Sequence, residues 1–127
     1  MNKVLIIGGN GLLGSNLVSC FLKKELKVGI LSRSVNSEFE NKVSVHQKDI
    51  LEYNGLEDIF SKYDIIINCI GQITNPTGLC LKLNTIGMDN IVNAIKMTGK
   101  RLIHISTVSV YGTANEVDEN SNLNPET

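Results

Sequence analysis

The sequence of 127 residues lacks several features that would point to particular partners. It has no excess of charge, because 12 Lys and Arg stand against 13 Asp and Glu, and a net charge of −1 gives no electrostatic reason for binding nucleic acid or an anionic membrane. It has no apolar run near the roughly 20 residues of a membrane helix. Glycines directly after Ile7 interrupt any signal-peptide core. We therefore expect neither a nucleic-acid partner nor a membrane partner.

Cysteine and histidine are also scarce. Cys20, Cys69 and Cys80 are odd in number, show no C-x-x-C spacing and sit in apolar segments, which is typical of small core residues in a reducing compartment. We therefore expect a cytoplasmic protein. Neither histidine has partners at metal-ligand spacing, so no metal site is predicted. His104 lies in an apolar run and is expected to be a hydrogen-bonded core residue, whereas His46 is expected at the surface.

Apolar runs alternate with segments of helical period along the whole chain. The predicted strands cover residues 4–7, 27–31, 43–45, 64–71 and 101–106. The predicted helices cover residues 12–24, a short segment at 56–60 with Asn54 as its N-cap, and residues 79–98 with Gly99 at the end. This alternation predicts one α/β domain over residues 1–127, a Rossmann-type doubly wound parallel sheet of order 3-2-1-4-5. Ligands of such sheets bind at the carboxyl ends of the strands.

The last polar residues, 119–127, lead into no further element, so we expect a chain cut short after its fifth strand. A sheet that stops there leaves an unpaired edge and an uncovered apolar face. We therefore expect either marginal stability or association of the protein made alone, for which a homodimer is the simplest form.

Three glycines follow the first apolar run. Gly8, Gly11 and Gly14 are spaced three apart, which lets a strand turn sharply into a helix and brings bare backbone close to a pyrophosphate. The helix N-terminus adds N–H groups and a partial positive charge. An ordinary glycine turn is the alternative. A Walker-type phosphate loop is not, because Ser15 and Asn16 stand where Lys and Ser or Thr are needed.

With three further motifs, the chain resembles the extended short-chain dehydrogenase/reductase family of sugar-nucleotide epimerases, dehydratases and reductases over its whole length. The glycine turn matches G-x-x-G-x-x-G, and Asp49 matches the acidic residue that in the family lies against adenine. The helix motif N-x-x-G-x-x-N-x-x-x-A is matched by Asn84, Gly87, Asn90 and Ala94. The strand ending S-[ST]-x-x-V-Y-G is matched by Ser106, Thr107, Val110, Tyr111 and Gly112.

The resemblance implies an NAD(P)-dependent epimerase, dehydratase or reductase that acts by hydride transfer on a nucleotide-sugar or a related carbonyl or alcohol. It also implies that residues 72–77 face the substrate. The residues expected to bind the cofactor are Gly8, Asn10, Gly11, Leu12, Leu13, Gly14, Ser32, Arg33, Asp49, Ile50, Cys69, Ile70, Gly71 and Asn84.

The choice of cofactor depends on the residues that follow the second strand. An acidic residue there accepts hydrogen bonds from the adenosine ribose of NAD, whereas an arginine favours the 2′-phosphate of NADP. This chain has Ser32, Arg33 and Ser34 there and no acidic residue before Glu38. NADP is therefore favoured, NAD is the alternative, and a solvated Arg33 is the other interpretation of that residue. The missing carboxylate also argues against a methyltransferase.

Thr107 stands four residues before Tyr111, where the family has a hydroxyl residue that hydrogen-bonds the reacting sugar oxygen. The resemblance thus implies a catalytic role for Thr107, and a local bond to the backbone is the alternative.

The family's general acid/base is the tyrosine of Y-x-x-x-K, in which the lysine lowers the pKa of the phenol. In this chain the residues four places after the three tyrosines are Glu57, Ile67 and Asn115. We therefore expect the chain to be inactive alone as the cofactor-binding part of an enzyme. The alternative is a non-catalytic dinucleotide-binding protein, such as a redox sensor or an assembly factor.

Overall fold

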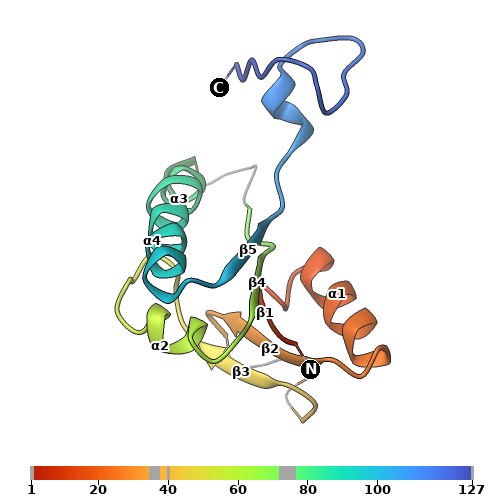
Figure 1. The fold of residues 1–127 in the computed structure, drawn as a ribbon. Coiled ribbons are helices and arrows are strands. Elements are labelled where there is room, and N and C mark those ends of the chain that lie inside the picture. Colours follow the sequence, from red (N-terminus) through yellow and green to blue (C-terminus); the bar gives the residue numbers. More distant parts are fainter. Residues whose placement is uncertain (1, 35–37, 40, 72–76, 127) are drawn as a thin grey trace.

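Five parallel strands form one sheet in the order β3-β2-β1-β4-β5 in the computed structural model, which describes residues 2–34, 38–39, 41–71 and 77–126 (Figure 1). The predicted sheet and its order are therefore confirmed. The strands are β1 (Lys3–Ile7), β2 (Lys27–Ser32), β3 (Ser44–Gln47), β4 (Ile65–Asn68) and β5 (Arg101–His104). The helices are α1 (Leu12–Lys23), α2 (Leu56–Phe60), α3 (Thr77–Lys82), the π-helical η1 (Leu83–Gly87), α4 (Met88–Thr98) and the 3-10 helix η2 (Val108–Tyr111).

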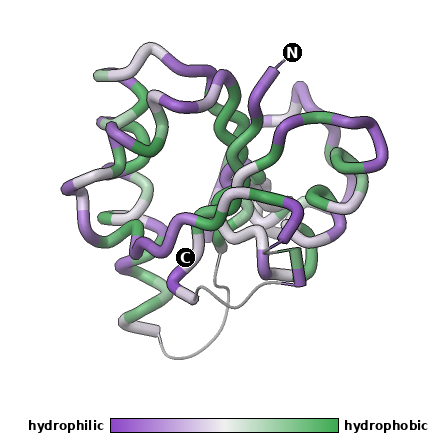
Figure 2. Tube along the Cα trace, turned by 90° about the horizontal axis from the view of Figure 1, so that it is seen from below, coloured by the Kyte–Doolittle hydropathy of each residue, from purple (hydrophilic) through white to green (hydrophobic). Residues whose placement is uncertain are grey.

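Helices cover both faces of the sheet, and successive residues of the central strand β1 face opposite sides. Leu5 and Ile7 pack into a cluster with α2 and α4, whereas Val4 and Ile6 pack with Val18 of α1. Because both faces are buried, β1 is a continuous apolar run, as is typical of a parallel sheet. Figure 2 shows the same pattern as apolar colour along the central strands.

Two predicted helices differ in detail from the structure. The segment 79–98 begins two residues earlier, and one π-helical turn, Leu83–Gly87, divides it. The predicted N-cap Asn54 is wrong, because Gly55 precedes α2 with a left-handed φ of 87° and no side chain caps this helix. Glycine enters that conformation without steric cost. At the other end of α4, the predicted stop at Gly99 is confirmed by its φ of 65°.

The predicted positions of the histidines and cysteines also need correction. Cys20 and His104 are exposed, since Cys20 lies on the outer side of α1 and His104 ends the edge strand β5. Cys69 and Cys80 are half-buried. His46 is half-buried, and its Nε2 lies 2.7 Å from the hydroxyl of Tyr63. Burial, and secondarily the charge of Lys62, lower the pKa of His46.

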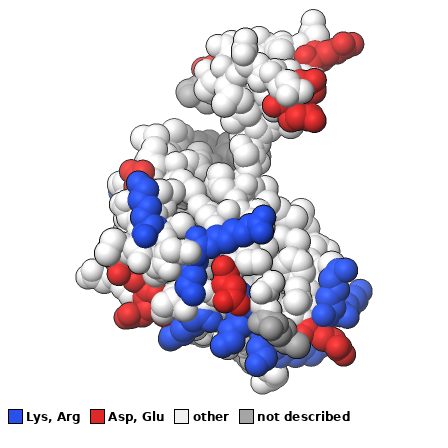
Figure 3. Space-filling model, in the orientation of Figure 1, with Lys and Arg blue, Asp and Glu red and all other residues white. Residues whose placement is uncertain are grey.

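After β5 the chain leaves the sheet, and the C-terminal part of the chain, from η2 onward, forms a separate lobe (Figure 1). The lobe closes on itself, because the N–H of Asn124 donates to the carbonyl of Val110 at 2.8 Å. Residues 113–126 hold four acidic residues and no Lys or Arg, and Figure 3 shows acidic side chains on this lobe. No helix among the described residues is long and apolar enough to cross a membrane.

Candidate functional site

The glycine-rich turn joins β1 to α1 through close backbone contacts. Gly8 has a φ of 80° and donates its N–H to the carbonyl of Leu31 at 2.9 Å, while its own carbonyl accepts the N–H of Gly11 at 2.9 Å. A Cβ on Gly14 would overlap with the Gly8 carbonyl oxygen and lie 2.8 Å from the Cα of Gly9. Helix α1 has neither a side-chain cap nor an acidic residue in its first turn. The turn therefore offers an N-terminus suited to an anion.

Side-chain hydrogen bonds hold the segment that follows β2 against this turn. The Asn10 amide donates to Oγ of Ser32 at 3.0 Å, and the N–H of Ser34 donates to the same oxygen at 3.0 Å. The Ser32 hydroxyl itself donates to the carbonyl of Ser34 at 2.8 Å. A hydroxyl has one proton and two lone pairs, so that of Ser32 has its full set of partners. Arg33 lies between the two serines, and its exposed side chain carries a positive charge at the end of β2.

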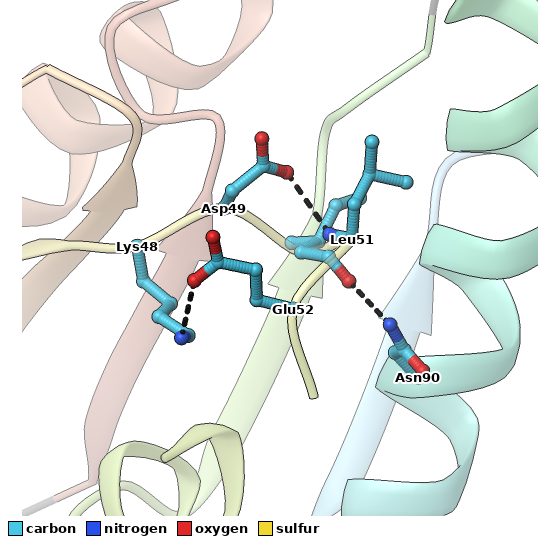
Figure 4. Close-up of polar contacts among 6 residues, drawn as sticks. Lys48, Asp49, Leu51, Glu52 and Asn90 are labelled. Atoms are coloured by element: carbon cyan, nitrogen blue, oxygen red, sulfur yellow. Dashed lines mark hydrogen bonds and ion pairs between the residues drawn. The ribbon is translucent and has the colours of Figure 1, made fainter. Parts of the chain in front are cut away.

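The loop after β3 forms the facing wall. The carboxylate of Asp49 accepts the N–H of Leu51 at 2.9 Å, which folds the Asp49 side chain back on its own loop (Figure 4). The Lys48 ammonium pairs with Glu52 at 2.9 Å, and the Lys48 N–H donates to the carbonyl of Ser32 at 2.9 Å. The loop is thus tied both to itself and to the end of β2.

These segments line a cavity of about 420 Å³, which we call the turn cavity. Lys48, Ser34 and Leu83, which the sequence did not single out, also line it. Ten of the predicted cofactor-binding residues line this cavity: Gly8, Asn10, Gly11, Ser32, Arg33, Asp49, Ile50, Cys69, Ile70 and Gly71.

The second cavity, the strand-exit cavity of about 520 Å³, lies at the ends of β4 and β5. Predicted residues Asn84 and Thr107 line it. Cys69, Ile70, Gly71 and Leu83 line both cavities, so the two meet where the chain leaves β4. Burial raises the pKa of the Cys69 thiol, which favours its neutral form at this junction.

Three predicted residues line neither cavity. Leu12 and Leu13 are 88% and 44% exposed on α1, and Gly14 is buried against the turn. Most of the predicted substrate-facing segment, residues 72–76, lies outside the described residues.

An amide and an imidazole that sequence reasoning did not assign to a site line the strand-exit cavity. The Asn68 side chain accepts the N–H of Ile70 at 3.0 Å, and its amide nitrogen lies 3.2 Å from Nδ1 of His104. Because the amide nitrogen is a donor, Nδ1 of His104 is the acceptor in this contact. A polar residue at the end of the apolar run 65–67 was the signal for Asn68 in the sequence.

Thr107 makes the local bond that was the alternative to a catalytic role. Its hydroxyl oxygen accepts the N–H of Ser109 at 3.2 Å and so caps η2, and it donates to the Ser109 hydroxyl at 3.3 Å. The same side chain is exposed on the strand-exit cavity. The local bond is thus observed, and the catalytic role remains a prediction.

The fold and the turn are those of a dinucleotide-binding α/β domain. The chain belongs to the NAD dependent epimerase/dehydratase family, which its sequence matches over residues 4–127. Among curated relatives, UDP-glucose 4-epimerase 2 of Arabidopsis thaliana is 28% identical over 136 residues, covering 91% of this chain and 39% of that protein.

Solved structures show the same likeness. The UDP-Glc/GlcNAc 4-epimerase of Campylobacter jejuni matches with a TM-score of 0.85 and 26% identity, over 98% of this chain and 44% of that one. The Bordetella bronchiseptica enzyme WbmG, in complex with NAD and UDP, matches with a TM-score of 0.82 and 21% identity, again over 98% and 44%, and supports the fold alone. The chain spans about two fifths of the length of the proteins it matches.

Proposed function

We propose that this chain binds one nicotinamide dinucleotide across both cavities, with adenosine in the turn cavity and nicotinamide in the strand-exit cavity. The observation that carries the proposal is the junction, since four residues are common to both linings. A dinucleotide is two nucleotides joined by a pyrophosphate, so it needs two pockets with an anion site between them. The glycine turn before α1 opens on the turn cavity and supplies the anion site, and Gly71, which has no side chain, lines both cavities where they meet.

We propose further that NADP is preferred over NAD. Ser32 stands at the end of β2, where a carboxylate would accept the ribose hydroxyls, and its hydroxyl is already used by Asn10 and Ser34. Arg33 and Lys48 supply positive charge in the same cavity. A guanidinium matches the geometry of a phosphate, so the 2′-phosphate of NADP suits this wall better than a bare ribose.

The dinucleotide supplies hydride transfer when bound, and the residues of this chain bind and orient. In the proposal, the Thr107 hydroxyl exchanges its donation to Ser109 for donation to the substrate oxygen, while the Ser109 N–H keeps the side chain in place. The proton relay needs an acid/base that the motif Y-x-x-x-K would provide, and these 127 residues do not contain it. We therefore propose that this chain binds the dinucleotide but is inactive alone.

The proposed substrate is a nucleotide-sugar. Its support is membership of the family and the names of the relatives, which include epimerases of UDP-sugars. We propose that the reaction on this substrate is an epimerisation, a dehydration or a reduction, because these three reactions share this part of the fold.

The test is calorimetric titration of the chain with NADP⁺ and NAD⁺, alongside the variants Arg33→Ala and Arg101→Ala. Both replacements remove one exposed arginine, but Arg101 begins β5 and lines neither cavity. We expect NADP⁺ to bind more tightly than NAD⁺, with Arg33→Ala weakening NADP⁺ about tenfold, equivalent to loss of one charge-assisted contact, and leaving NAD⁺ within about twofold.

The outcomes separate the two parts of the proposal. Absence of binding of either dinucleotide would contradict the dinucleotide site itself. Tighter binding of NAD⁺ than of NADP⁺ would contradict only the preference. An equal effect of Arg33→Ala and Arg101→Ala would show that Arg33 acts through overall charge alone.

A further inference from the structure

One side-chain contact joins the helical side of the fold to the wall of the turn cavity. The amide nitrogen of Asn90, in α4, donates to the carbonyl of Ile50 at 2.8 Å (Figure 4). Ile50 is 2% exposed and Asn90 is half-buried, so this hydrogen bond is largely shielded from water. The partners are 40 residues apart in the sequence, and the bond therefore fixes a tertiary position.

Gly87, the last residue of η1 and the residue directly before α4, receives the Ile50 side chain. A Cβ on Gly87 would lie 2.7 Å from Cδ1 and 3.1 Å from Cγ1 of Ile50. The Ile50 carbonyl is thus bound by Asn90 of α4, and the Ile50 side chain packs into the space at Gly87, where η1 meets α4. The π-helical turn Leu83–Gly87 lies in this stretch, and such turns frequently mark functional sites.

The held residue belongs to the cavity wall. Ile50 and its neighbour Asp49 line the turn cavity, and Asp49 stands between two anchors. On one side the Lys48 N–H donates to the carbonyl of Ser32, and on the other the Ile50 carbonyl accepts from Asn90. The Asp49 side chain bonds only within its loop among the contacts of the described residues, so these two anchors set where it stands.

We propose that Asn90 is a positioning residue for the adenosine-side wall of the turn cavity, acting through the Ile50 carbonyl, with Gly87 providing the space for Ile50. The inference rests on the proposed dinucleotide site and adds to it a determinant outside both cavity linings. It assigns two tasks to the continuous helical stretch of η1 and α4. Asn84 lines the strand-exit cavity, while Gly87 and Asn90 hold the wall of the turn cavity.

The primary test compares Asn90→Asp with Asn93→Asp. Aspartate has the size of asparagine but no donor when ionised, so at position 90 it would face the Ile50 carbonyl with an acceptor. Asn93 is exposed on the same helix and gives the same change of charge and composition. Both variants are titrated with AMP and, separately, with nicotinamide mononucleotide, by NMR of the ¹⁵N-labelled chain well below the melting temperature.

We expect Asn90→Asp to weaken AMP at least fivefold and to leave nicotinamide mononucleotide within twofold, with Asn93→Asp unchanged for both. Equal weakening of the two probes would mean a general structural role and would overturn the proposal, as would AMP binding at the wild-type level. A wild-type chain that binds neither AMP nor NADP⁺ would contradict the proposed function itself. A wild-type chain that binds AMP, together with an Asn90→Asp variant that binds it equally well, would contradict only the role of Asn90.

If Asn90→Asp does not fold, a second pair of variants tests the position of the same cavity wall through the contact of Gly87 with Ile50. Gly87→Ala pushes against the Cδ1 atom of Ile50, and Ile50→Val removes that atom. We expect Gly87→Ala to weaken AMP and the double variant to recover at least half of the loss on a logarithmic scale. Additive losses in the double variant would show that the Gly87–Ile50 contact does not position the wall, and would overturn the proposal.

Discussion

Replacing Gly14 with alanine tests whether the glycine turn depends on close contact between backbones. The added Cβ would overlap with the carbonyl oxygen of Gly8 and would lie 2.8 Å from Cα of Gly9 and 2.9 Å from the Gly8 carbonyl carbon. All three neighbours are backbone atoms of the turn, so no side chain can rotate away. We therefore place the cost at the upper end of the range for overpacking, about 3 kcal/mol.

The matched control is Gly78→Ala. Gly78 lies in α3, and a Cβ there would meet nothing within 4 Å. Alanine is favoured over glycine inside a helix by about 0.5–1 kcal/mol, so the same chemical change is expected to stabilise the protein or leave it unchanged. The two variants therefore differ in sign as well as in size.

The assay is thermal unfolding followed by circular dichroism. A domain of this size changes its melting temperature by roughly 4 °C for each kcal/mol, so we expect Gly14→Ala to melt about 10 °C or more below the wild type and Gly78→Ala at or slightly above it. Melting of Gly14→Ala within about 2 °C of the wild type, or equal shifts for both variants, would refute the close packing of the turn.

Two further predictions concern charge. Because burial lowers the pKa of His46, the folded protein binds fewer protons there than the unfolded chain. The stability that neutral His46 provides is therefore present above its ordinary pKa of 6.5 and is lost as the pH falls below that value. Urea unfolding at pH 7.5 and 5.5 should show a smaller loss of stability for His46→Gln than for the wild type, and equal losses would contradict this. Glu52→Gln frees the ammonium of Lys48 in the turn cavity and should strengthen NADP⁺ binding about twofold to fivefold at low salt. The control Glu25→Gln makes the same change in charge and should not strengthen it. Calorimetry at low and high salt measures both affinities, and equal gains would show that the ion pair of Lys48 with Glu52 does not affect NADP⁺ binding.

The sheet was predictable because its central strands are buried on both faces. The runs around Leu5 and Ile66 are apolar without alternation, and the glycine turn after the first of them identifies the strand from which the sheet is wound in both directions. In these central strands the local apolar pattern is sufficient to predict a strand, since burial on both faces admits few polar residue types. Toward the edges it is weaker. His104 lies in an apolar run, yet it is exposed because β5 has a neighbour on one side only.

The predicted site residues gather at the carboxyl ends of the strands for a reason of topology. Gly11, Arg33, Asp49 and Gly71 follow four different parallel strands, and parallel strands end at one edge. Sequence reasoning missed Lys48 and Asn68, although each adjoins or ends a strand at the same edge. Leu12 and Leu13 belong to the first turn of α1, where backbone rather than side chains would meet a ligand, and neither side chain lines a cavity.

The contacts that hold this edge together could not be read from the sequence. The bond from Asn90 to Ile50 joins residues 40 apart, and the same Ile50 side chain packs against Gly87 at the end of the π-helical turn. No periodicity reports such a turn, because the apolar pattern of residues 79–98 reads as one regular helix. The hydrogen bond from Asn10 to the Ser32 hydroxyl is a similar case, since these two side chains become neighbours only once the turn and β2 are side by side.

The central claim is that one dinucleotide occupies both cavities at once, and amide chemical-shift mapping of the ¹⁵N-labelled chain with NADP⁺ tests it most directly. The account predicts saturable shifts at a single affinity in both linings, at Gly11 and Arg33 in the turn cavity and at Ser109 and Val110 in the strand-exit cavity. Shifts confined to one cavity, separate affinities for the two, or no shifts at all would contradict it.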